Sequence, residues 1–314
     1  MMQTSRRPTG LLAATRAVVL PLGILPVLVG SAYAWTVTGE IQWMWLGLAL
    51  LGAGALHLGA NVVNDVYDIR SGVDELAEDL EGSIRTGSPE ATPGLAVSLF
   101  GAAAACGVVL ALYRGPLVLA YGAIGALLAF FYVAPPIALG YRGRGLGELA
   151  ILIAFGPLPV VGAYYVQTAA EDIPGYVGPL SSELLGAPLF VWLLGVLPGL
   201  FTMMVLYSHH FLHHTADRTA RKMTPVAAWG PEFGLKLIRP MVGATIAALI
   251  ALIGLQILPW WAASSGPPLV LLWTAVRRAE HRKDLRGYML LLRAAAVASI
   301  AGQSLLVVSL LLAV

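Results

Sequence analysis

The sequence predicts an all-α, polytopic membrane protein with about nine transmembrane helices in one domain, residues 1–314. Hydrophobic residues make up 58% of the chain and charged residues only 11%, whereas soluble domains carry about 25% charged residues. The apolar residues form runs of roughly 20, the length that crosses a bilayer. Basic residues gather in alternate links between these runs, which is typical of a multi-pass protein.

The first five apolar runs begin near Leu11, Ile41, Gly94, Pro116 and Glu148. The first ends in a pattern that suits signal-peptide cleavage, but it is long enough to span and carries Arg16, so we expect a retained helix. The second closes in an acidic stretch. The third holds the single cysteine, Cys106, which excludes an intrachain disulfide. Between the fourth and the fifth lies the Pro- and Gly-rich link YVAPPIALGYRGRGLGE.

The last four runs begin near Pro188, Pro240, Leu258 and Tyr288. The sixth run leads into YSHHFLHHTADRTARKMTPV, which holds four of the six histidines. Prolines inside the first, fifth and sixth runs predict kinked helices, because neighbouring helices in a membrane bundle can satisfy the freed backbone groups.

The distribution of charge predicts the orientation. With the N-terminus on the cytoplasmic side, the outer links hold a single basic residue, Arg114, while the inner segments hold nearly all the others. Basic residues favour the cytoplasmic side. We therefore expect a multi-pass protein of the cell inner (plasma) membrane, with its N-terminus and both polar motifs cytoplasmic. No nucleic-acid partner is expected.

The second run ends in HLGANVVNDVYDIRSGVDE. On a helix, Asn61, Asn64, Asp65 and Asp68 share one face, with Asp74 close behind. Carboxylates gathered at a membrane boundary are costly and mark a functional site. Their oxygens suit Mg²⁺, which is usually held by one or two carboxylates together with substrate phosphates. A solvated helix end and the sodium site of a transporter are the alternatives.

The segment Asn61–Asp74 reads N-x-x-N-D-x-x-D-x-x-x-G-x-D and resembles the first aspartate-rich motif of the UbiA superfamily of intramembrane prenyltransferases. Arg16 with LPLGILPVLVG resembles the first helix of that family. Residues 131–167 resemble the central segment of the branch that prenylates 1,4-dihydroxy-2-naphthoate in menaquinone synthesis. The R-T-x-x-R-P run of the 4-hydroxybenzoate and haem-farnesylating branches is missing, so the naphthoate branch fits better.

The histidine segment resembles the second aspartate-rich region of the naphthoate branch, N-x-x-x-D-x-x-x-D-R-x-x-G-K-R-T-L. Asp217, Arg218 and Lys222 match this pattern. His209 and His213 stand where the Asn and the first Asp are expected. The i, i+4, i+8 spacing predicts that His209, His213 and Asp217 line one helical face.

The histidines leave several interpretations of this second site open. Imidazole is a good ligand for Mn²⁺ or Zn²⁺ but a poor one for Mg²⁺, so a softer metal is one option. Protonated histidines could instead bind a diphosphate as cations. Asp217 alone could hold Mg²⁺ while the histidines shape the acceptor pocket. A plain interfacial cluster is the fourth option. Arg221, in place of the glycine of the pattern, is a further departure.

The resemblance implies prenyl transfer from an allylic prenyl diphosphate to an aromatic acceptor within the lipid bilayer. The implied ligands of Mg²⁺, with Mn²⁺ or Zn²⁺ as options on the histidine side, are Asp65, Asp68, Asp217, His209 and His213. The implied substrate-binding residues are Asn61, Asn64, Arg16, Asp74, Arg85, Tyr141, Arg142, Arg218 and Lys222. Tyr132 would face the allylic cation and completes a catalytic set with Asp65, Asp68 and Asp217.

Other functions stay open at this point. The histidine replacements allow the same transfer to a different aromatic or lipid acceptor. An ion-coupled transporter would use the acidic face for coupling, and a metal-binding membrane protein would bind zinc without turnover. For Arg142, a substrate-binding role competes with a simple place in a tight Pro-Gly turn.

Overall fold

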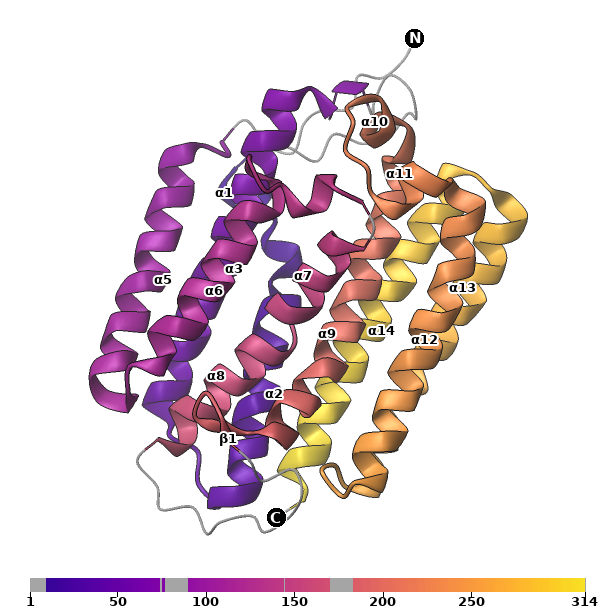
Figure 1. The fold of residues 1–314 in the computed structure, drawn as a ribbon. Coiled ribbons are helices and arrows are strands. Elements are labelled where there is room, and N and C mark those ends of the chain that lie inside the picture. Colours follow the sequence, from indigo (N-terminus) through magenta and orange to yellow (C-terminus); the bar gives the residue numbers. More distant parts are fainter. Residues whose placement is uncertain (1–9, 74, 77–89, 144, 170–182, 314) are drawn as a thin grey trace.

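The computed structural model describes residues 10–73, 75–76, 90–143, 145–169 and 183–313. They form a bundle of long helices that run along a common direction (Figure 1). Its helices and strands are α1 (Leu11–Ala14), η1 (Ala17–Val19), α2 (Leu20–Thr38), α3 (Trp43–Ser71), α5 (Pro93–Arg114), α6 (Leu117–Val133), η2 (Leu139–Tyr141), α7 (Leu146–Ala154), α8 (Pro157–Thr168), β1 (Glu183–Leu184), β2 (Ala187–Pro188), α9 (Leu189–His209), η3 (His210–Leu212), α10 (His214–Thr219), α11 (Pro225–Trp229), α12 (Pro231–Gly254), η4 (Trp260–Ser265), α13 (Pro268–Arg282) and α14 (Leu285–Leu311).

Several helix ends follow from local capping chemistry. Thr92 and Thr224 cap α5 and α11, and in each case proline follows at the first helical position. Asp284 caps α14 and accepts a hydrogen bond from the backbone N–H three residues on, at 2.7 Å. Gly72, with φ of 71°, ends α3 in the left-handed conformation that glycine adopts most easily. The acidic face therefore occupies the last turns of α3.

The prediction of a helical membrane bundle is confirmed. Seven of the described helical segments are long and apolar enough to cross a membrane. Of the other predicted runs, α6 is a shorter apolar helix, and α13 has 15 residues. The predicted number of nine is therefore approximate.

Two predicted helix starts are wrong. Pro240 lies inside α12, which begins at Pro231, where proline costs no hydrogen bond. A membrane bundle tolerates the interior proline. The run predicted from Leu258 first forms η4, and α13 begins only at Pro268.

A break between α7 and α8 packs closely against α9 in the middle of the bundle. The break falls at Phe155 and Gly156, just before Pro157. A Cβ atom on Gly156 would lie 2.5 Å from the carbonyl oxygen of Gly195 in α9. Small residues allow this close helix approach, and the break leaves Phe155 directed toward the interior cavity described below.

Both polar segments lie at one end of the bundle, where α10 and α11 are labelled in Figure 1. An ion pair between Asp68 and Lys222 joins them there. The β1–β2 hairpin and the end of α14 lie at the opposite end. Arg114 is buried and donates to the backbone carbonyls of Val166 and Gln167 at 2.6 and 2.9 Å.

Candidate active site

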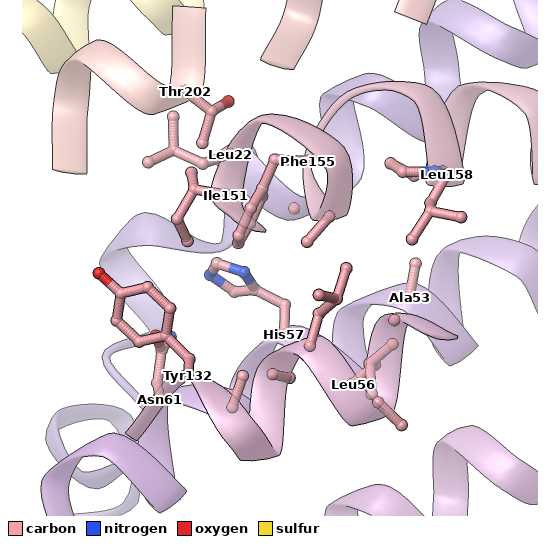
Figure 2. Close-up of a pocket in the computed structure, with 18 of the residues that line it drawn as sticks. Leu22, Ala53, Leu56, His57, Asn61, Tyr132, Ile151, Phe155, Leu158 and Thr202 are labelled. Carbon is pink, nitrogen blue, oxygen red and sulfur yellow. The ribbon is translucent and has the colours of Figure 1, made fainter. Parts of the chain in front are cut away.

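A cavity of about 810 Å³ lies inside the bundle. Helices α2, α3, α5, α6, α7, α8, α9 and α14 all contribute to its wall. Its polar residues include Arg16, Asn64, Asp68, Asp217 and Lys222. The rest of the lining is mainly leucine, alanine, valine and aromatic side chains, and Figure 2 shows part of it. The cavity thus joins a charged end to an apolar interior.

Asp68 is the most connected acid at the charged end. Its carboxylate accepts a hydrogen bond from the Asn64 side-chain amide at 3.1 Å. The Lys222 ammonium donates to the other oxygen at 3.1 Å, and the Tyr141 hydroxyl lies 3.4 Å from the same oxygen. Three side chains, from α3 itself, from η2 and from the turn after α10, therefore hold one carboxylate at the cavity wall.

Asp65 plays a different structural part from Asp68. It is fully buried and forms an ion pair with Arg16. Arg16 lines the cavity while Asp65 is not part of the lining. Asn61 ties the same region together, because its amide donates to the Thr15 carbonyl at 3.1 Å. All four predicted residues lie in the continuous helix α3, but only Asn61, Asn64 and Asp68 face the cavity.

Lys222 links the two polar segments. Its ammonium lies 3.1 Å from Asp68 and 3.9 Å from Asp217, and 5.4 Å from the centre of the Tyr141 ring. Burial by itself would lower the pKa of Lys222, but the carboxylates of Asp68 and Asp217 outweigh it and raise that pKa. Lys222 therefore stays charged between the two acids.

The histidine segment does not form the single helix that its spacing predicts. Helix α9 ends at His209, a 3-10 turn follows, and α10 begins at His214. The break places Phe211 in the core, 1% exposed, against Tyr288. The prediction of one helical face is wrong. Even so, the rings of His209 and His213 lie 5.0 Å apart.

The buried histidine at position 213 is neutral near pH 7. Burial first, and then the nearby Lys222 ammonium, lower the pKa of His213 to about 4. This weighs against the interpretation in which protonated histidines bind a diphosphate. His209, His213 and Asp217 all line the cavity. His214 is not part of the cavity lining. Its Nδ1 atom lies 3.0 Å from the Phe211 carbonyl oxygen.

The aromatic and basic residues predicted to bind substrate divide into two groups. Tyr132 lines the cavity (Figure 2), and Tyr141 contacts Asp68. Arg142 is exposed, and its guanidinium donates to the Pro136 and Ile137 carbonyls, each at 2.6 Å. It thus closes the Pro-Gly turn.

Arg218 is exposed on α10, and neither it nor Arg142 lines the cavity. Substrate binding by these two arginines stays a prediction. Asp74 and Arg85 lie outside the described residues. Arg221 has φ of 60°, a left-handed conformation that favours glycine. The backbone at position 221 thus has a conformation that suits glycine, the residue of the resembled pattern.

Within the described ranges, no three His, Cys, Asp or Glu side chains form a group that could hold a metal ion by themselves. The carboxylates of Asp68 and Asp217 are nonetheless oxygen donors of the kind that Mg²⁺ prefers, and both line the charged end of the cavity. These two acids would supply part of the shell of a divalent metal, which phosphate oxygens would have to complete.

Two histidines of this cavity were not among the predicted site residues. His57 lies one helical turn before Asn61 on α3 and lines the cavity wall. A histidine inside an apolar run was the available signal. His210 also lines the cavity, and its Nδ1 atom lies 3.4 Å from Glu148 Oε1 of α7. Only the packing of α7 against the end of α9 reveals that pair.

Comparison with known proteins gives a family match. Residues 23–312 match the model described as the UbiA prenyltransferase family. The chain is 29% identical over 229 residues to 2-carboxy-1,4-naphthoquinone phytyltransferase of Synechocystis, covering 72% of this chain and 68% of that protein. It is 35% identical over 177 residues to 1,4-dihydroxy-2-naphthoate octaprenyltransferase of Mycobacterium tuberculosis, covering 55% of this chain and 59% of that protein.

Solved structures share the fold. A UbiA homologue from Aeropyrum pernix matches with a TM-score of 0.63 and 14% identity, covering 89% of this chain and 96% of that one. A UbiA homologue from Archaeoglobus fulgidus bound to DMAPP and Mg²⁺ matches with a TM-score of 0.58 and 14% identity, covering 94% and 99%. At these identities the likeness concerns the helical bundle.

Proposed function

Because this chain belongs to the UbiA prenyltransferase family, we propose that it transfers a prenyl group from an allylic diphosphate to 1,4-dihydroxy-2-naphthoate, in menaquinone synthesis. The observation that carries this proposal is the continuity of the cavity. Carboxylates and cations at one end suit a diphosphate, and the apolar interior suits a prenyl chain and an aromatic ring. Residues 1–314 would act as one catalytic domain.

The charged end would bind the diphosphate. Asp68 and Asp217 would hold Mg²⁺ together with phosphate oxygens, as hard oxygen donors do. When bound, Mg²⁺ would supply charge stabilisation for the leaving diphosphate. Mg²⁺ accompanies DMAPP in the related Archaeoglobus structure, which supports this choice. Lys222 and Arg16 line the same end and would neutralise further phosphate charge.

The apolar part of the cavity would protect the reactive intermediate. The C1–O bond of the donor breaks, its electron pair leaves with the diphosphate, and an allylic cation remains. A water-poor wall prevents its hydrolysis, and the face of Tyr132 would stabilise the positive charge. An electron-rich ring carbon then bonds to C1. In the naphthoate branch, that carbon loses its carboxylate as CO₂ and the ring regains aromaticity.

The names of the relatives support this choice of acceptor. Two of them are named for 2-carboxy-1,4-naphthoquinone or 1,4-dihydroxy-2-naphthoate. A different aromatic acceptor is the second candidate, because His209 and His213 stand in the cavity wall where the resembled pattern has Asn and Asp. Seven helices in the described part of the chain are long and apolar enough to span a membrane, which supports a multi-pass protein. We further propose the plasma membrane, with the charged end cytoplasmic.

The test is prenyl transfer by the purified protein in lipid nanodiscs. Labelled geranylgeranyl diphosphate and 1,4-dihydroxy-2-naphthoate would be supplied with Mg²⁺, Mn²⁺, Zn²⁺ or a chelator. We expect metal-dependent product, and a loss of at least about 100-fold in Asp68→Asn, since each transition-state interaction lost at such a site costs several kcal/mol. Glu232→Gln is the matched control, because Glu232 is an exposed acid paired with Lys283.

The outcomes separate the parts of the proposal. Donor consumption without naphthoate product would retain the transfer chemistry and reject this acceptor. Equal rates with Mg²⁺ and with chelator would reject the metal. No release of diphosphate under any condition would contradict prenyl transfer itself.

A further inference from the structure

His57 is a polar residue in the apolar part of the cavity. It lies four residues before Asn61 on α3, which places it about 6 Å farther from the charged end at 1.5 Å per residue. Its side chain lines the cavity and is 7% exposed. Neither the charged end nor the mechanism above uses it.

Both ring nitrogens of His57 are buried polar atoms. Among the described residues, neither ring nitrogen of His57 has a hydrogen-bond partner. Its ring contact with Phe155 is edge-to-face, with ring centroids 5.2 Å apart. Leaving a buried polar group unsatisfied costs about 1–3 kcal/mol, and such groups inside a membrane protein mark functional sites. A ligand in the cavity would relieve that cost.

The surrounding helices leave room for this ring and hold it in place. A Cβ atom on Gly23 of α2 would lie 2.8 Å from His57 Cγ, so glycine is needed opposite the ring. Phe155 contacts the ring from α7–α8. Figure 2 shows His57 projecting from α3 into the space bordered by Tyr132, Ile151 and Phe155. The orientation of the imidazole is therefore set before a ligand enters.

We propose that His57 binds the aromatic acceptor by accepting a hydrogen bond from a ring hydroxyl. This rests on the proposed function and assigns a residue to its second substrate. A prenyl chain has no polar atom to satisfy the imidazole, whereas a hydroxylated ring does. With the diphosphate between Asp68 and Asp217, the ring that meets donor C1 lies farther along the cavity, toward Tyr132 and His57.

The first test is kinetic. His57→Leu removes the acceptor nitrogen, and we expect the KM for 1,4-dihydroxy-2-naphthoate to rise about 10-fold, the value of one lost hydrogen bond. The KM for the prenyl diphosphate should stay within about twofold, since that substrate makes no polar contact here. His57→Gln retains an acceptor oxygen and should restore most of the affinity. His281→Leu, at an exposed histidine of α13, is the matched control.

The second test is binding without turnover. In nanodiscs, calorimetry would compare 1,4-dihydroxynaphthalene with 1,4-dimethoxynaphthalene, which has no hydroxyl to donate. The wild type should prefer the diol about 10-fold, and His57→Leu should lose this preference. If transfer fails but the preference depends on His57, the proposed function fails and the binding site stands. If transfer occurs and His57→Leu still prefers the diol equally, the assignment of His57 is overturned.

Discussion

The two polar segments that meet at the charged end are built differently. The first, Asn61–Asp68, lies in an unbroken helix, and both of its acids have a cationic partner, Arg16 or Lys222. The second, His209–Lys222, spans a helix end, a 3-10 turn, a new helix and the turn after it. It carries neutral imidazole at position 213.

The two segments therefore contribute different charges to the cavity. The first segment contributes Asp68, the acid that three side chains hold. The second contributes mainly Lys222, the cation that faces this acid. Lys222 lies nearer to Asp68, 154 positions away in sequence, than to Asp217 of its own segment. Lys222 therefore links the two segments. The following substitutions change Lys222 itself or a side chain near it.

The largest effect is expected from Lys222→Met. The substitution leaves Asp68 and Asp217 buried and facing each other without their shared cation. Removing one partner of a buried ion pair costs about 3–5 kcal/mol, and transfer should fall at least about 100-fold. Thermal unfolding and prenyl transfer would measure the two effects.

The matched control for Lys222→Met is Lys283→Met. Lys283 pairs with Glu232 with both side chains exposed, so its loss should cost less than about 1 kcal/mol. Equal effects of the two substitutions would show that Lys222 does not couple the segments. Partial recovery of the Lys222→Met melting temperature by Mg²⁺ would sharpen the comparison, because a metal cation would replace the lost charge.

A smaller effect is expected from His213→Gln, and it depends on pH. The pKa of His213 falls from 6.5 in the unfolded chain to about 4 in the folded protein. The folded state therefore binds this proton more weakly, so stability is retained above about pH 6.5 and is lost as the pH falls toward 4. At about pH 5.5 the loss is on the order of 1 kcal/mol.

Unfolding of the metal-free protein at about pH 7.5 and pH 5.5 measures this contribution. Over this interval, the free energy of unfolding of His213→Gln should fall by about 1 kcal/mol less than that of the wild type. His281→Gln, at an exposed histidine, should behave as the wild type. An unchanged pH dependence in His213→Gln would mean that His213 is not the buried neutral group of the second segment.

The smallest effect is expected from Tyr141→Phe. Its hydroxyl lies 3.4 Å from Asp68, and burial raises the pKa of Tyr141 to about 12, so it remains a proton donor at working pH. Losing this long contact should slow transfer about three- to fivefold, or up to about 1 kcal/mol. Tyr113→Phe, at an exposed tyrosine, is the control. If Tyr141→Phe slowed transfer more than Lys222→Met does, the hydroxyl of Tyr141 and not Lys222 would be the main partner of Asp68.

Local patterns predicted part of the site and missed part of it. The face of α3 was predictable, because the 3.6-residue period and Gly72 define it without reference to other helices. The histidine face was not, since the chain leaves the helix at His210 and buries Phe211 instead. The partner of Asp65, Arg16, comes from a turn of left-handed backbone that precedes α2.

The helical membrane bundle, its approximate spans and the acidic helix end could be predicted from the sequence, because run length, hydropathy and helical period are local properties of the chain. The position of Lys222 between Asp68 and Asp217, and of His57 in the cavity wall, could be seen only in the folded protein. Those placements depend on how distant helices pack, on glycine contacts such as Gly23 against His57, and on where α9 stops. Packing of this kind arises from the sum of many side-chain contacts, which no short segment contains.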